Sequence, residues 1–324
     1  MLDIRISPPQ KQIRYGEKIM LWGSCFTEHI GGRLAKSKFS ILQNPNGILF
    51  DPLSVSRSIL ACMENRIYTA KDLVYLNELW QSWDHHSMYS GISSDEVLQK
   101  INDSTGTAHT FLKNADHLVI TLGSAFTYRL AGTSRQVANC HRAPGQTFNK
   151  VLLGTDEIVF AYTTLLAELR AMNPALQVIF TISPVRHIRD GVIENNRSKS
   201  RLIEAVHTIV GDNDNCCYFP AYELVIDVLR DYRFYDIDMV HPNYAATEFV
   251  FEQFVQHFIY PDDRKLMEEV RNIMNAVSHR AMHPETEAHK QFLRNSLDKT
   301  LALQDRIPAI DFTGELNYFR SALK

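Results

Sequence analysis

Short apolar runs alternate with helix-periodic stretches along most of the chain. Near-continuous apolar runs bounded by turn residues are typical of buried strands, and apolar residues at every third or fourth position are typical of helices. We expect strands at residues 19–22, 39–43, 117–123, 176–184 and 216–219. Strands joined by crossover helices lie parallel and are covered on both faces. The pattern therefore predicts an α/β fold, a three-layer α/β/α sandwich around a mostly parallel five-stranded sheet.

The spacing of apolar residues also places the helices. Phe26, Ile30 and Leu34 recur every four residues behind the first strand. Further helices are predicted at residues 51–63, 156–171, 197–211, 221–231 and 244–260. Beyond residue 262 the chain becomes more charged but stays helix-periodic, with a break at Pro284. We therefore divide the chain into an α/β/α domain, residues 1–261, and a helical C-terminal extension, residues 262–324.

Composition excludes several classes of partner. The 324 residues are 45% hydrophobic and carry a formal net charge of −3, without the basic stretch expected of a nucleic-acid binder. No apolar run reaches the roughly 18 residues of a membrane helix, and the N-terminus lacks the pattern of a secretory signal. The five cysteines form no CxxC pair. We expect a cytoplasmic protein that binds neither nucleic acid nor membrane.

The residues that follow the predicted strands are small or polar. In open α/β sheets, ligands bind beyond the carboxyl ends of the strands. The pairs at these positions are Gly23-Ser24, Asn46-Gly47, Gly123-Ser124 and Ser183-Pro184. We expect them to converge on one rim of the sheet.

Ser24 lies between the first strand and its helix, where unpaired N–H groups and the helix dipole favour negative charge. A hydroxyl there can attack an acyl carbon while its own N–H helps to hold the oxyanion. Position alone leaves open a serine that only caps the helix. Cys25 is a competing nucleophile, because a helix N-terminus can lower the pKa of a thiol.

Asp238 and His241 lie three residues apart, just before the helix that starts near Tyr244. The carboxylate can then accept a hydrogen bond from Nδ1–H and leave Nε2 free to take a serine proton. An Asp N-cap beside a surface histidine is the alternative. The position after the last strand, opposite Ser24, favours a triad of Ser24, His241 and Asp238.

Several short motifs together resemble a known family. They are GSCF at 23–26, NPNGILFDP at 44–52, VITLGSAFTY at 119–128, VANCHR at 137–142, TISPVRH at 181–187 and DMVHPNYAA at 238–246. In combination they resemble the GSCFA family, among the SGNH/GDSL-type hydrolases, from about residue 18 to 258. The resemblance implies a flavodoxin-like hydrolase fold, with Ser24 as nucleophile and Asp238 and His241 as the late Asp-x-x-His block.

The same resemblance implies an oxyanion hole made by the nucleophile's N–H, a second-block glycine and a third-block asparagine. Gly47 matches the glycine, with Asn46 beside it, but the third block has Ala125 where the asparagine is expected. Losing one oxyanion donor costs about 10²–10³ in rate in a well-studied protease. Candidate replacements are Asn46, Ser124 and Asn139.

Further rim residues are candidate substrate contacts: Gly123, His141, Arg186 and His187. The positive pair at 186–187 suits an anionic or carbohydrate ligand, although a solvated surface pair explains it equally well. The stretch WDHHS at 83–87 gathers possible metal ligands, but no third ligand at a suitable spacing completes a site. We expect no metal ion and no organic cofactor.

The sequence thus predicts an esterase that hydrolyses an O-acyl ester, such as an acetyl group on a small molecule or carbohydrate. In this hypothesis Ser24 attacks, His241 moves the proton, Asp238 orients His241, and the N–H groups of Ser24 and Gly47 bind the oxyanion. Two alternatives stay open. The same triad suits acyl transfer to another hydroxyl, and a binding protein with a weakened oxyanion hole would keep the fold without activity.

Overall fold

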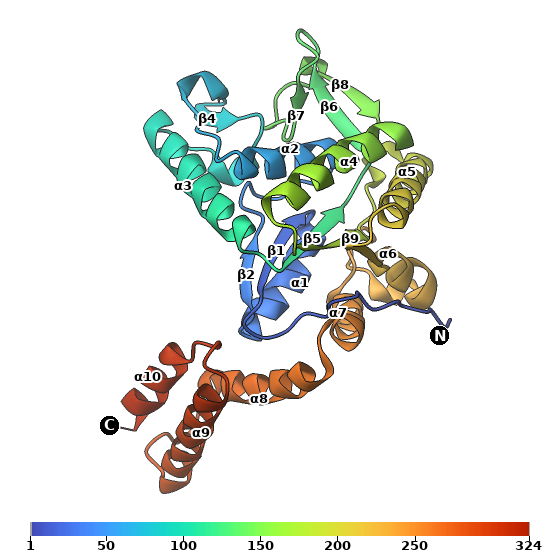
Figure 1. The fold of residues 1–324 in the computed structure, drawn as a ribbon. Helices are drawn as coiled ribbons and strands as arrows, with labels where there is room; N and C mark the ends of the chain where they lie inside the picture. Colours follow the sequence, from blue (N-terminus) through green and yellow to red (C-terminus); the bar gives the residue numbers. More distant parts are fainter. Residues whose placement is uncertain (1, 324) are drawn as a thin grey trace.

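The computed structural model describes residues 2–323. Its central sheet has five strands in the order β10-β9-β5-β1-β2, and all four pairings are parallel. The strands are β1 (Lys18–Gly23), β2 (Ser40–Gln43), β5 (His117–Leu122), β9 (Gln177–Ile182) and β10 (Cys216–Phe219). Helices cover both faces of this sheet (Figure 1), so the predicted three-layer sandwich is confirmed.

One face of the sheet packs against four helices: α2 (Pro52–Met63), α3 (Ser94–Lys113), α4 (Thr155–Met172) and α5 (Val192–Gly211). The other face packs against α1 (Cys25–Lys36), α7 (Tyr244–Phe258) and the short α6 (Ala221–Glu223), which continues as a π-helical segment, Leu224–Leu229. Successive side chains of a strand point to opposite faces. Met20 and Trp22 of β1 accordingly enter the first core, while Ile19 and Leu21 enter the second.

Two small antiparallel sheets are additions that the sequence pattern did not predict. β3 (Leu73–Leu76) pairs with β4 (Leu79–Ser82), and β6 (Phe126–Leu130) pairs with both β7 (Gln136–Val137) and β8 (Phe148–Leu152). These strands are short and most are only partly buried, so they lack the uniform apolar run of the central strands. Short 3₁₀ turns lie at Ala70–Asp72, Ser87–Tyr89, Gly145–Thr147, Ile188–Asp190 and Tyr232–Phe234.

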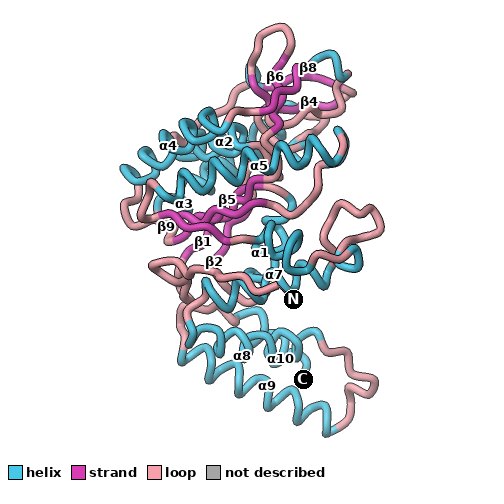
Figure 2. The backbone as a smooth tube through the Cα atoms, turned by 90° about the vertical axis from the view of Figure 1, so that its right-hand side faces the viewer, coloured by secondary structure: helices cyan, strands magenta, loops and turns pink. Residues whose placement is uncertain are grey.

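The C-terminal helices α8 (Pro261–Ser278), α9 (Glu287–Arg306) and α10 (Thr313–Ala322) pack around an apolar cluster of their own. Figure 2 shows them together below the sheet, on the side of α1 and α7. Lys38 contacts Glu315 at 2.7 Å, and the N–H of Tyr15 donates to Asp263 at 2.8 Å. We keep the division at residue 261 as a proposal. Among residues 2–323, no helix has the length and apolar character needed to cross a membrane.

The carboxyl end of β1 comes very close to β5. Gly23 has φ +139°, and a Cβ added there would lie 2.1 Å from the carbonyl oxygen of Thr121. The N–H of Ser24 donates to that same oxygen at 3.1 Å. Only glycine allows this approach, which fixes where the chain leaves the sheet.

Gly23→Ala is expected to lower the free energy of unfolding by roughly 2–5 kcal/mol, since the new methyl group overlaps the Thr121 carbonyl and the positive φ disfavours a side chain. Urea denaturation measures the change. Gly32→Ala in α1 is the matched control, because nothing lies within 4 Å of the added Cβ. It is expected to stabilise by about 0.5–1 kcal/mol. Equal unfolding of Gly23→Ala and the wild type would contradict the close approach.

Candidate active site

Ser24 occupies the N-cap position of α1 without capping it. Its backbone is extended, with φ −68° and ψ 171°, and its side chain accepts no hydrogen bond from the helix. The N–H of Thr27 donates instead to the main-chain oxygen of Ser24 at 2.9 Å. The hydroxyl is buried and has no partner within residues 2–323. Capping therefore does not account for this serine. A buried polar atom without a partner costs free energy, so the hydroxyl needs another explanation.

Cys25, the competing nucleophile, lacks the lowered thiol pKa that a position at a helix N-terminus can give. Burial, followed by the nearby carboxylate of Glu28, raises the pKa of the Cys25 thiol. Since the thiolate is the nucleophilic form, this shift works against a catalytic role for Cys25.

Asp238 and His241 form a tight pair. One carboxylate oxygen of Asp238 lies 2.6 Å from Nδ1 of His241, while the other accepts the N–H groups of Val240 and His241 at 2.9 and 3.0 Å. These bonds, that of the His241 N–H foremost, lower the pKa of Asp238 to about 2. An ionised carboxylate accepts from Nδ1–H, which leaves Nε2 free.

The alternative in which Asp238 caps a helix does not fit the structure. The N-cap of α7 is Asn243, whose side-chain oxygen accepts from the N–H of Ala246 at 3.2 Å. Asp238 instead orders its own loop and the imidazole of His241. The three-residue spacing thus brings the carboxylate of Asp238 to Nδ1 of His241, which is the contact that the sequence predicts.

The loop that carries His241 is tied to the carboxyl-end rim of the sheet. The N–H of Arg186, in the loop after β9, donates to the carbonyl of Val240 at 3.1 Å. The loop that carries His241 therefore lies beside the loop that follows β9.

A buried lysine connects two strands beneath the rim. Nζ of Lys199 donates to the carbonyls of Gly123 and Ser183, each at 2.6 Å, and so joins the ends of β5 and β9. The side chain is almost fully buried, and burial lowers the pKa of Lys199 to about 7. Lys199 therefore fixes the ends of β5 and β9 relative to each other, although its ammonium group is costly to bury.

Gly123 lies at the centre of the rim. A Cβ added there would lie 2.9 Å from Cβ of Phe50, 3.1 Å from Nε2 of His187 and 3.4 Å from Cβ of Ser24. The N–H of Gly123 donates to the carbonyl of Phe50 at 2.8 Å. The backbone of Gly123 thus separates Ser24 from His187 without a side chain between them.

A cavity of about 630 Å³ opens beside this glycine, over the β6–β8 sheet. Its walls combine aromatic side chains with basic ones, chiefly Phe50, Phe126, Tyr128, Phe148, Arg142, Lys150 and Arg189. Ser124, Asn139, His141 and His187 also line it. This volume lies within the range of small-molecule sites.

The expected oxyanion donors are mostly engaged elsewhere, which corrects the sequence-based set. The N–H of Ser24 donates to Thr121, and the N–H of Gly47 donates to the carbonyl of Asn44 at 2.8 Å. The amide of Asn46 lies 3.1 Å from His85, and its oxygen accepts from the thiol of Cys62. Backbone turn geometry and a long-range side-chain contact, neither visible in the sequence, direct these groups away from Ser24.

Ser124 and Asn139 are also partly engaged. The Ser124 hydroxyl lies 3.1 Å from that of Ser198 and accepts the N–H of Phe126. The Asn139 oxygen accepts the N–H of His141 at 2.8 Å, so only its amide nitrogen remains for a ligand in the cavity.

The candidate substrate contacts separate into two groups. His187, His141 and Gly123 lie at or near the cavity, although Nε2 of His141 is already bound to the carbonyl of Ser82 at 2.7 Å. Arg186 is not among the residues that line the cavity. Its guanidinium stacks over Tyr235, 4.6 Å from the ring centroid.

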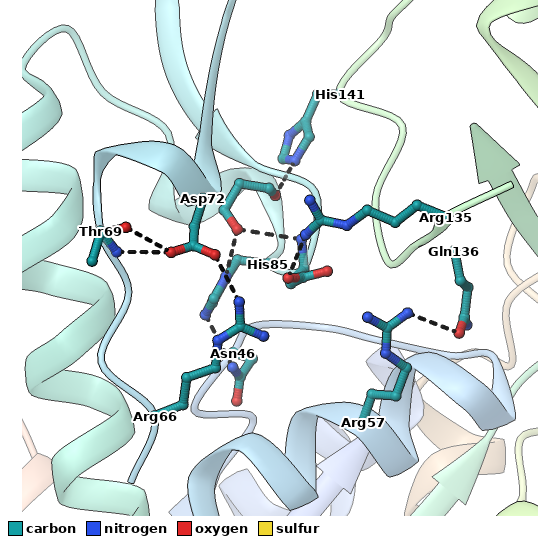
Figure 3. Close-up of polar contacts among 11 residues, drawn as sticks. Asn46, Arg57, Arg66, Thr69, Asp72, His85, Arg135, Gln136 and His141 are labelled. Atoms are coloured by element: carbon teal, nitrogen blue, oxygen red, sulfur yellow. Dashed lines mark hydrogen bonds and ion pairs between the residues drawn. The ribbon is translucent and has the colours of Figure 1, made fainter. Parts of the chain in front are cut away.

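The WDHHS stretch forms a structural network rather than a ligand set. Figure 3 shows His85 directed at Asn46, with Asp72 held by Arg66 and Thr69 beside it. Asp84 pairs with Arg135 at 2.8 Å. Within residues 2–323, no three His, Cys, Asp or Glu side chains gather as metal ligands.

Sequence reasoning missed Lys199 and Phe50. Lys199 falls on the same face of α5 as the buried residues Leu202 and Val206, at helical spacing. A lysine on an otherwise apolar stripe was the available signal. Phe50 lies in a loop, where no periodic pattern identifies a residue that packs against the site.

The sequence matches two family models. A model of the GSCFA family matches residues 18–254, and a model described as GSCFA domain protein, C-terminal domain, matches residues 270–324. The resemblance inferred from the short motifs is thereby confirmed. None of the curated proteins compared with the chain matches it.

Solved structures similar to the chain share 12% sequence identity with it. They include a carbohydrate esterase family 3 from Talaromyces cellulolyticus (TM-score 0.36, covering 78% of this chain and 99% of that one). Another is an acetyl xylan esterase from the rumen bacterium Butyrivibrio proteoclasticus (TM-score 0.40, 79% and 67%). A third is an acetyl esterase mutant with an acetate ion (TM-score 0.35, 78% and 99%). These values are too low to carry an activity over to this chain.

Lys199→Met is expected to change how stability depends on pH. The pKa of Lys199 falls from the ordinary 10.5 to about 7 on folding, so between these values the unfolded chain binds more protons than the folded one. The wild type should therefore gain stability relative to Lys199→Met as the pH rises from 7 to 10. Urea denaturation of both proteins at several pH values measures the difference.

The control for that comparison is Lys113→Met, which removes an exposed lysine at the end of α3. A constant stability difference between wild type and Lys199→Met over this pH range would contradict the buried environment described for Lys199.

Proposed function

Because the chain belongs to the GSCFA family, has a buried serine hydroxyl without a partner within residues 2–323 and holds an imidazole against a carboxylate, we propose that it is an SGNH-type serine esterase for a small O-acyl ester. The observation that carries the proposal is Ser24. Its hydroxyl stands at the end of β1 and at the start of α1, buried and without a partner. An acyl ester bound at the rim would give this hydroxyl its reaction partner.

In the first half-reaction, Oγ of Ser24 attacks the acyl carbon while Nε2 of His241 takes the hydroxyl proton. The carboxylate of Asp238, 2.6 Å from Nδ1, holds the ring in the required tautomer and stabilises the imidazolium that forms. The tetrahedral intermediate collapses when the bond to the alcohol oxygen breaks. His241 returns the proton to that oxygen, the alcohol leaves, and Ser24 carries the acyl group.

Water completes the cycle. His241 accepts a proton from water as the water oxygen attacks the acyl carbon, and collapse of the second intermediate releases the carboxylic acid and restores Ser24. The start of α1 contributes positive potential here, since the N–H groups of Cys25 and Phe26 have no intrahelical acceptor. No cofactor enters this scheme.

The cavity beside Gly123 supports the choice of substrate. Its aromatic walls suit the apolar faces of a sugar ring or another compact alcohol, and its polar groups suit hydroxyls. We therefore propose a small acyl group, such as acetyl, on a carbohydrate or similar small molecule.

Ser24→Ala is expected to abolish labelling by a fluorophosphonate probe and to lower kcat on p-nitrophenyl acetate by about 10³-fold or more. Cys25→Ala is the matched control at the adjacent position and is expected to stay within a few-fold of the wild type. Mass spectrometry locates the labelled residue. Labelling that persists in Ser24→Ala would remove Ser24 from the mechanism.

Asp238→Asn tests the orientation of His241. The asparagine oxygen still accepts the backbone N–H groups, but its NH₂ group then faces Nδ1 and favours the wrong tautomer. We expect kcat to fall by about 10²–10⁴-fold with little change in folding. Asp236→Asn, in the same loop and with the same change in charge, is the control. Equal activity of the two variants would argue against the Asp238–His241 pair.

A further inference from the structure

The candidate site has a deficit in oxyanion donors. The third-block asparagine is absent, and the N–H groups of Ser24 and Gly47 bind backbone carbonyls. A tetrahedral intermediate on Ser24 would thus need a donor that the sequence motif does not identify. Such donors act in a fixed position, aimed at the charge that develops.

Two buried polar atoms without partners lie around the same glycine. They are Oγ of Ser24 and Nε2 of His187. The position of a Cβ on Gly123 would be 3.1 Å from Nε2 of His187 and 3.4 Å from Cβ of Ser24. A buried polar atom without a partner needs an explanation, and a single ligand beside Gly123 would supply a partner to both of these atoms.

We propose that His187 is a further catalytic residue, whose Nε2–H donates to the oxyanion formed when Ser24 attacks an ester, in place of the missing side-chain amide. This assignment rests on the proposed esterase function. It places the carbonyl oxygen of the substrate over Gly123, in reach of both Oγ of Ser24 and Nε2 of His187, at the end of the cavity that His187 and Phe50 line.

The backbone of His187 is held by a hydrogen bond, and its ring packs against one aromatic side chain. Its backbone N–H donates to the side-chain oxygen of Asn195, a buried residue of α5, at 2.8 Å. Its ring packs against that of Phe50, with centroids 5.3 Å apart. A donor fixed before the reaction needs no reorganisation when the oxyanion forms.

The charges around His187 favour a neutral ring. Burial, followed by the positive groups of Lys199, His241 and Lys150, lowers its pKa to about 3. A neutral imidazole has one N–H and is a weak base, so it suits hydrogen-bond donation better than proton abstraction. The general-base role stays with His241, whose Nδ1 is held by Asp238.

The test compares His187→Leu, which removes the donor, with His187→Gln, which keeps an N–H donor. The burst-phase acylation rate on p-nitrophenyl acetate should fall about 10²–10³-fold in His187→Leu, with KM nearly unchanged. His187→Gln should recover to within about tenfold of the wild type. A boronic acid that forms a tetrahedral adduct on Ser24 should lose affinity in parallel, and the pH midpoint of the rate should stay the same.

His29→Gln is the control, because His29 is an exposed histidine of α1 with no role in the proposed mechanism. Thermal unfolding shows that each variant is folded. Nitrogen chemical shifts of the His187 ring should show a proton on Nε2 from pH 5 to 8. An acylation rate in His187→Leu equal to that of the wild type overturns the proposal, as do equal losses in His187→Leu and His187→Gln, which indicate packing alone.

The experiments distinguish failure of the esterase proposal from failure of the role proposed for His187. In that case the wild type itself takes up no fluorophosphonate at Ser24, and the role of His187 falls with it. Labelling of Ser24 at the same rate in the wild type and in folded His187→Leu overturns only the role of His187.

Discussion

The close approach of β1 to β5 is the constraint on which the site depends. Because Gly23 has no side chain, the carbonyl of Thr121 lies where a Cβ would be, and it accepts the N–H of Ser24. The side chain of Asn44 accepts the N–H of Gly23 at 2.9 Å, which ties the loop after β2 to the same point. The main chain therefore fixes Ser24, and its hydroxyl needs no side-chain bond to hold it.

A second set of bonds joins the remaining loops. The carbonyl of Phe50 accepts the N–H groups of Gly123 and Ser124, while Lys199 binds the carbonyls of Gly123 and Ser183. The loops after β2, β5 and β9 thus meet through backbone carbonyls and one buried lysine side chain. The buried ammonium opposes folding, but its two hydrogen bonds satisfy carbonyls that strand pairing leaves open at the ends of β5 and β9.

The sequence predicted the central sheet well, because strands buried on both faces are uniformly apolar. The predicted strand at residues 216–219 coincides with β10, and the other four differ by one or two residues at their ends. The small sheets were missed because their strands are short and most of them are only partly buried. The contact between Asp238 and His241 could be predicted because the two residues are close in sequence. Contacts were not predicted where a group's direction depends on distant partners, as for Asn46, whose amide meets His85.

Under the two proposals, the imidazoles of His241 and His187 have different roles because their surroundings differ. His241 is half-exposed, and its carboxylate partner at Nδ1 fixes the tautomer and leaves Nε2 free. His187 is shielded from water at Nε2 and lies near Lys199, Lys150 and His241, an arrangement that opposes protonation. A proton carrier and a neutral donor can then work side by side at one pH. Such a division explains how a chain without the third-block amide can keep a complete set of catalytic groups.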